Sequence, residues 1–114
     1  MKLPQIFFDF DRYNIRADQE ATLADNADKM KVKWSKKRFA LEGYCDTRGT
    51  DEYNLALAER RCTSVYNFLV ASGVDASRLE IKPIGETEQF NQDGMGMEQN
   101  YQENRRVHFV DISD

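Results

Sequence analysis

Residues 43–65 read GYCDTRGTDEYNLALAERRCTSV, and this stretch decides the fold. It opens as the end of a β-rich segment, passes through a short polar loop and continues into an amphipathic pattern. Thr50 is a good helix N-cap, and acidic residues follow it in the first turn, where they complement the helix dipole. Apolar residues then recur at three- and four-residue spacing, namely Leu55, Ala58, Cys62, Val65 and Leu69. The stretch therefore predicts a strand, a loop and one long helix that ends before Gly73.

The segments before this unit predict a strand, a helix and the start of the central strand. Residues 5–10 are short and β-rich, and they read as the first strand. Apolar residues at helical spacing run from Ala17 to Met30, with acidic residues at the start of that run. Residues 38–44 then predict the second strand, which leads into the polar loop.

The segments after the long helix predict two more strands. Residues 79–85 form the third, in which Pro83 lacks an N–H donor and so favours an edge position or an irregular strand. Residues 86–103 are polar and predict a loop, with a helical turn as the alternative, and residues 106–110 predict the last strand. The order β-α-β-α-β-β indicates an α/β (α+β sandwich) fold, with one mixed four-stranded sheet and its helices packed on one face.

Composition narrows the classes of protein to consider. The chain has 114 residues, of which 40% are hydrophobic and 32% charged, which suits one globular domain over residues 1–114. No run of about 18 apolar residues occurs, and Met1–Pro4 is too short and polar for a signal peptide. We therefore expect either a cytoplasmic protein or a piece of a longer exported chain. A net charge of −4 argues against binding to nucleic acid.

The residues offer little to an enzyme. His108 is the single histidine and has no obvious nucleophile beside it, and no glycine-rich phosphate loop is present. Asp9 and Asp11 are an acid pair without any other sign of glycoside hydrolysis. Cys45 and Cys62 are too few and too far apart in sequence for a zinc site, which leaves packing thiols or a disulfide. We expect no catalysis, no metal and no cofactor.

Two charged residues suggest a binding site instead. Asp46 lies in a tight polar turn at a strand end, where ligands commonly bind, although a turn or cap aspartate is the alternative. Arg61 falls at the edge of the apolar stripe of the helix, nearly in line with Asn54, although a helix surface with ordinary ion pairs is the alternative. Together, Asp46 can receive an ammonium and Arg61 a carboxylate, which would hold a zwitterionic amino-acid head.

The run from Gly43 to Val65 resembles the OmpA-like C-terminal domain family, and within it the peptidoglycan-associated lipoprotein (Pal) branch. Further motifs agree at fixed spacing over about residues 5–111. They include FDFD at 8–11, Gly73-Val74, Gly85-Glu86 and NRRV at 104–107. The resemblance implies a domain that binds peptidoglycan, without cleaving it, through the diaminopimelate of the stem peptide.

The resemblance also assigns roles by position. Asp46 matches the residue that meets the ligand's ammonium, and Arg61 the one that meets its carboxylate. The other matched positions are Phe10 and Asp11, which line the ligand, Arg48 and Asn54, which shape the pocket, and the pair Arg105 and Arg106, whose role is mixed. Departures from the family pattern are Tyr44 for histidine, Ala58 for serine, Cys62 for alanine, and Phe90 near a common proline.

The resemblance implies a tether in the periplasm, anchored to the outer membrane as part of a longer exported protein. Contact with a membrane would then come only through a segment upstream of this sequence. Two rival functions keep the same fold: a docking module for a Tol-type envelope protein, and a wall-anchoring domain of an inner-membrane motor stator.

Overall fold

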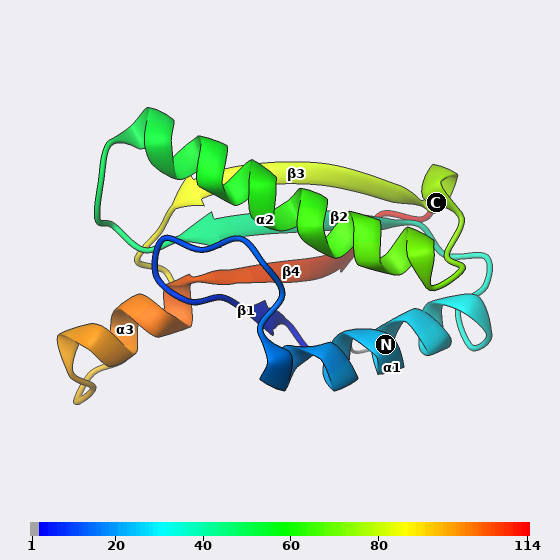
Figure 1. Ribbon diagram of the computed structural model, residues 1–114, viewed down its shortest axis with the longest axis horizontal. Coiled ribbons are helices and arrows are strands. Elements are labelled where there is room, and N and C mark those ends of the chain that lie inside the picture. Colours follow the sequence, from blue (N-terminus) through cyan, green and yellow to red (C-terminus); the bar gives the residue numbers. More distant parts are fainter. Residues whose placement is uncertain (1–2) are drawn as a thin grey trace.

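The computed structural model describes residues 3–114, and Figure 1 shows a sheet with two long helices against one face. The four strands lie in the order β1-β4-β2-β3. The two central strands are β2 (Phe39–Cys45) and β4 (Arg106–Asp111), which pair antiparallel, while β2 pairs parallel with β3 (Leu79–Glu86). The short β1 (Ile6–Phe7) pairs antiparallel with β4. The predicted mixed four-stranded sheet is therefore confirmed.

Pro83 explains the irregular edge of this sheet. Strand β3 pairs only with β2, so it occupies the edge position that a proline without an N–H favours. The register between the two strands shifts between Gly43 and Tyr44, where Tyr44 pairs with Gly85. Both alternatives predicted from Pro83, an edge position and an irregular strand, are therefore confirmed.

Two helices cover one face of the sheet. Helix α1 (Glu20–Lys31) follows a short 3₁₀ helix, η1 (Ala17–Gln19), and α2 (Asp51–Ala71) lies along the sheet beside it (Figure 1). The cap predictions are confirmed at both ends of α2: Thr50 Oγ1 accepts a hydrogen bond from Tyr53 N at 3.2 Å, and Gly73 has a φ of 103°. The core between helices and sheet is apolar and includes Ile6, Phe8, Leu23, Met30, Phe39, Leu41, Val65, Leu69 and Val107.

Glycine lets α2 come very close to the sheet. A Cβ on Gly43 would lie 2.5 Å from the Cys62 sulfur and 2.6 Å from the Ala58 carbonyl oxygen. The backbone of β2 therefore touches the helix directly at this point. Cys45 and Cys62 are both buried free thiols at this contact, as the first of the two alternatives predicts.

Three predictions need correction. Of residues 5–10, predicted as the first strand, only Ile6–Phe7 form it. The polar segment after β3 holds a full helix, α3 (Met97–Asn104), and not only a loop or a single turn; it lies at one end of the sheet (Figure 1). Leu55 is 47% exposed and lies outside the apolar stripe, whereas Leu57 is buried beside Cys45 and Ala58. The first turn of α2 passes over Gly85, so Leu55 lies above that glycine and outside the core. In the described part of the chain, no helix has the length and apolarity that crossing a bilayer requires.

Candidate functional site

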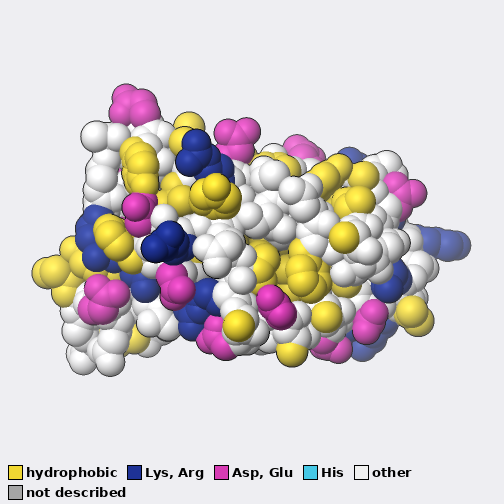
Figure 2. All heavy atoms as spheres, viewed as in Figure 1, with side chains coloured by type: hydrophobic (Ala, Val, Ile, Leu, Met, Phe, Trp, Pro, Cys, Tyr) yellow, Lys and Arg dark blue, Asp and Glu magenta, His cyan; other side chains and the backbone are white. Residues whose placement is uncertain are grey.

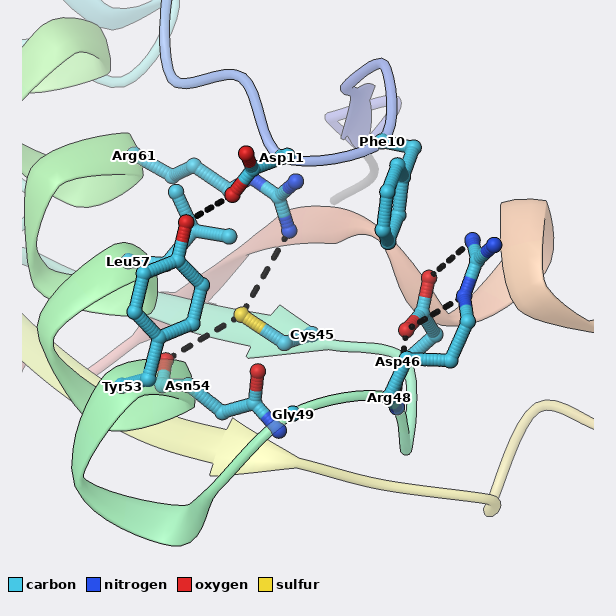
Figure 3. Close-up of a pocket in the computed structure, with 10 residues that line it drawn as sticks. All are labelled: Phe10, Asp11, Cys45, Asp46, Arg48, Gly49, Tyr53, Asn54, Leu57 and Arg61. Carbon is cyan, nitrogen blue, oxygen red and sulfur yellow. Dashed lines mark hydrogen bonds and ion pairs between the residues drawn. The ribbon is translucent and has the colours of Figure 1, made fainter.

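A pocket of about 270 Å³ opens where the carboxyl end of β2, the first half of α2 and the segment after β1 meet (Figure 3). Long-range packing assembles it, because its walls come from residues more than 40 positions apart. It is lined by Phe10, Asp11, Cys45, Asp46, Arg48, Gly49, Tyr53, Asn54, Leu57 and Arg61. All six principal site residues predicted from the sequence are therefore brought together around one cavity.

Asp46 supplies a buried carboxylate at one side of the pocket. Only 4% of the residue is exposed. Its Oδ1 accepts hydrogen bonds from Arg48 N and Nε at 3.1 and 3.3 Å, and its Oδ2 accepts from Arg48 Nη2 at 2.8 Å. Burial acts to raise the pKa of this carboxyl, but the hydrogen bonds from Arg48 outweigh it and hold the pKa below its ordinary value. Asp46 is therefore an ionised acceptor at neutral pH.

Arg48 is held in place by two aromatic rings. Its guanidinium carbon lies 3.8 Å from the centroid of the Phe10 ring and 4.2 Å from that of Tyr101, which belongs to α3. Cation–π contacts of this kind favour a guanidinium over other side chains. Phe10, itself 51% exposed, thus forms part of the rim of the pocket.

Arg61 differs from its predicted environment. We expected it at a helix edge within reach of water, but only 1% of it is exposed. Its Nε and Nη2 donate to the carbonyls of Arg12 and Asp9 at 2.8 and 2.9 Å, and Nη1 donates to the carbonyl of Tyr44 at 3.2 Å. The segment after β1 folds over the helix edge and excludes water, and this burial lowers the pKa of the guanidinium. Arg61 therefore ties that segment to β2, and it also faces the pocket.

Asn54 and Cys45 line the pocket near Arg61 (Figure 3). The Cys45 thiol donates to the Asn54 carbonyl at 3.2 Å and receives a long contact from Arg61 Nη1 at 3.5 Å. Asn54 is 2% exposed, and its Nδ2 has no hydrogen-bond partner among residues 3–114. A buried amide N–H₂ without a partner is costly. Figure 3 shows the amide oxygen toward the cavity and Nδ2 turned away from it, so a half-turn of the amide would present this unpaired donor to a ligand acceptor.

Asp11 closes the outer side of the pocket. Its backbone has a φ of 57°, in the left-handed region that aspartate tolerates better than most residues. Its carboxylate accepts a hydrogen bond from the Tyr53 hydroxyl of α2. Tyr53 was not among the predicted residues, and no local signal could have found it, because its contact with Asp11 joins residues far apart in the chain.

The arginine pair after α3 is divided between two places. Arg105 is buried and directs Nη1 to Asp46 Oδ2 at 3.4 Å and to Glu98 Oε1 at 3.3 Å, while its Nε donates to the Phe8 carbonyl at 2.9 Å. Arg106 does not reach the pocket, because its guanidinium stacks on Phe90 at 3.4 Å. Arg105 caps the end of α3 and Arg106 is the first residue of β4, and of the two only Arg105 reaches Asp46.

The surface around the pocket carries charge of both signs. Figure 2 shows Lys and Arg side chains interspersed with Asp and Glu over the part of this face where α2, α3 and the segment after β1 meet. No single sign dominates there. A surface of this kind suits a ligand that itself carries opposite charges more than it suits a polyanion.

The fold and the site define a class of protein: a small α+β domain with a pocket between sheet and helix that is lined by charged side chains of both signs. The OmpA family model matches residues 7–103. The chain belongs to the OmpA family. Relatives named peptidoglycan-associated lipoprotein include that of Mesorhizobium japonicum, 44% identical over 71% of this chain and 48% of its own length. The protein of that name from Pseudomonas aeruginosa is 39% identical over 89% of this chain and 58% of its own.

Solved structures agree with this membership. The crystal structure of the peptidoglycan-associated lipoprotein from Burkholderia pseudomallei matches with a TM-score of 0.82 at 31% identity, covering 94% of this chain and 88% of that one. The C-terminal domain of MotB from Helicobacter pylori has a TM-score of 0.82 at 19% identity, over 99% of this chain and 87% of that one, and shows the fold alone. This chain spans about half the length of the first named relatives.

Proposed function

We propose that this domain binds peptidoglycan through the diaminopimelate of the stem peptide and so tethers the outer membrane, or a membrane protein, to the cell wall. The observation that carries the proposal is a single pocket lined by a buried carboxylate, Asp46, and a buried guanidinium, Arg61. The name of the relatives and membership of the OmpA family support it. A location in the periplasm, as part of a longer exported protein, belongs to the same proposal.

The ligand's charged groups have distinct partners in this pocket. Diaminopimelate carries an ammonium and a carboxylate on its distal carbon, which match the carboxylate of Asp46 and the donors opposite it. Arg61 already gives hydrogen bonds to three carbonyls, so it does not offer the full bidentate fork that we expected from the sequence. The unpaired Nδ2 of Asn54 would supplement it once the amide turns this donor toward the pocket. We propose that Asn54 and Arg61 together receive the carboxylate.

A comparison of two stem peptides tests the ligand class. Lysine-type peptidoglycan offers the ammonium but has no carboxylate on the distal carbon, so the donors of Asn54 and Arg61 would stay unpaired. Sites built to hydrogen-bond a ligand group reject analogues that lack it. We expect the lysine peptide to bind more weakly by about 1.5–3 kcal/mol, or about 10- to 100-fold. Calorimetry with matched peptides at one salt concentration measures this, and equal affinities would contradict the role of the carboxylate.

Variants test the two sides of the pocket separately. Asp46→Asn keeps the shape of the side chain and removes its charge, and Asn54→Leu removes the free amide donor. Each should lower the amount of protein bound to purified diaminopimelate-type sacculi about 10-fold or more, while the circular dichroism spectrum stays unchanged. Arg60→Met is the matched control, because Arg60 is exposed and does not line the pocket. Wild-type binding by both pocket variants would refute the assignment. Docking to a Tol-type partner remains a prediction that this experiment does not address.

A further inference from the structure

Asp46 is already paired in the free domain. Three contacts from Arg48 and one from Arg105 reach its two oxygens at 2.8–3.4 Å. The Asp46 side chain is 5% exposed, whereas that of Arg48 is 31% exposed and lies on the outside of the pair. These four contacts use the roughly four acceptor positions of a carboxylate, so an ammonium can bond to Asp46 only by displacing one of them, and Arg48 is the more exposed of the two arginines.

Arg48 lies in a slot that leads to a second acceptor. Phe10 and Tyr101 cover its guanidinium at 3.8 and 4.2 Å, so the rings restrict the group to motion between them. Its Nη1 is 3.8 Å from Glu98 Oε2, whose side chain is 69% exposed. A short displacement within the slot would exchange one carboxylate partner for the other without taking the cation off the rings.

We infer that Arg48 is an internal surrogate for the ligand's ammonium: it neutralises Asp46 in the free domain, and a ligand ammonium binds by displacing it toward Glu98. The inference rests on the proposed function. Arg105 stays in place through this exchange, because it is buried and bonded to the Phe8 carbonyl at 2.9 Å. Asp46 thus keeps one cation on its inner side. Arg48 and Glu98 then influence the affinity for the ligand although neither of them forms an attractive contact with it.

A double-mutant cycle tests the exchange. A diaminopimelate-containing stem tripeptide is titrated calorimetrically into the wild type, Arg48→Gln, Glu98→Gln and the double variant. Removing the surrogate, Arg48, should tighten binding by about 2- to 5-fold, the factor that corresponds to one partly exposed ion pair. Glu98→Gln, which removes the second acceptor, should weaken binding by about 2- to 5-fold in the wild-type background. In the Arg48→Gln background the same substitution should change the affinity by less than about 2-fold. Arg48→Lys keeps the cation but loses the paired Nε and Nη2 contacts with Asp46, so its affinity should lie between those of the wild type and Arg48→Gln.

The outcomes separate the two proposals. If Arg48→Gln weakens binding as strongly as Asp46→Asn does, Arg48 holds the ligand and the exchange is refuted. An equal effect of Glu98→Gln in both backgrounds would also refute it, because Glu98 would then act through Arg105. If none of the four proteins binds the tripeptide or sacculi, the proposed function fails and the exchange fails with it. Binding by the wild type without dependence on Arg48 overturns the exchange alone. Urea midpoints of the four proteins verify that all are folded.

Discussion

Replacing Arg61 with methionine should destabilise the domain as well as weaken its binding. The guanidinium is buried and donates to the carbonyls of Asp9, Arg12 and Tyr44 at 2.8–3.2 Å. Methionine has a similar length but no donor, so these carbonyls lose their partner. A buried polar group left without a hydrogen bond costs about 1–3 kcal/mol.

The change in the free energy of unfolding depends on which of the three carbonyls can form a hydrogen bond with water once the guanidinium is gone. Asp9 and Arg12 are exposed residues of the segment after β1, so solvent can replace their lost hydrogen bonds in part. The Tyr44 carbonyl belongs to the buried strand β2 and bears the cost in full. Removing the buried charge also relieves its desolvation, which offsets part of the loss. We therefore expect the free energy of unfolding to fall by about 2–4 kcal/mol.

Urea unfolding followed by circular dichroism measures this change. Arg60→Met is the matched control, because Arg60 is exposed and its aromatic contact with Tyr13 is a long one, at 5.7 Å. The control should change the free energy of unfolding by no more than about 0.5 kcal/mol. If Arg61→Met loses no more than its control, Arg61 does not anchor the segment that carries Phe10 and Asp11. In that case a binding defect of an Arg61 variant would report on ligand contact alone.

Three further outcomes follow from the structure. Gly43→Ala should lower the free energy of unfolding by at least about 2 kcal/mol, because the added Cβ would lie 2.5 Å from the Cys62 sulfur and 2.6 Å from the Ala58 carbonyl oxygen. Urea unfolding measures this, and an unchanged free energy of unfolding would refute the close approach of helix and strand. Burial raises the pKa of Asp46, but the hydrogen bonds from Arg48 outweigh burial and the folded-state pKa is lower than the ordinary value of 3.8. The ionised carboxylate therefore stabilises the fold fully above pH 3.8, and this stabilisation is lost as the pH falls through the folded-state pKa. In acid the wild type should lose stability relative to Asp46→Asn, and parallel curves of stability against pH would contradict this. Burial raises the pKa of the Cys45 thiol to about 11 and that of Cys62 to about 12, so both should resist alkylation at mildly alkaline pH until urea is added, and the intact mass should equal that of the reduced chain.

Local signals in the sequence predicted most of the fold. The Thr50 cap, the glycine at 73 and the apolar period between them place α2 within a residue of its observed ends, because caps and periodicity act within one helical turn. Helix α3 was missed because its eight residues are almost all polar and carry no apolar period. Its anchor is long-range: Asn104 Oδ1 accepts from Phe90 N at 3.1 Å, and Nδ2 reaches the Asn91 side chain at 2.6 Å.

Tyr44 and Phe90, two positions where the sequence departs from the pattern that the resemblance implies, contact each other in the structure. Tyr44 and Phe90 make an edge-to-face contact, with ring centroids 5.2 Å apart and an interplanar angle of 88°. His108 contacts both rings, at 5.5 and 5.0 Å. The residues are 46 positions apart in the chain, so no local signal could pair them. The same limit applies to Arg61, whose burial depends on a segment about 50 residues earlier.

The burial of the site explains why its specificity should be for a zwitterion. A buried charge costs free energy unless a partner is present, and in the free domain each charge has an internal one: Arg48 for Asp46, and main-chain carbonyls for Arg61. A ligand with only an ammonium could replace Arg48 but would leave the Asn54 amide without an acceptor. A ligand with only a carboxylate could meet that amide but would have nothing to offer Asp46. On the proposed function, only a group that carries both charges on one carbon satisfies both sides of the pocket at once, and the distal end of diaminopimelate is such a group.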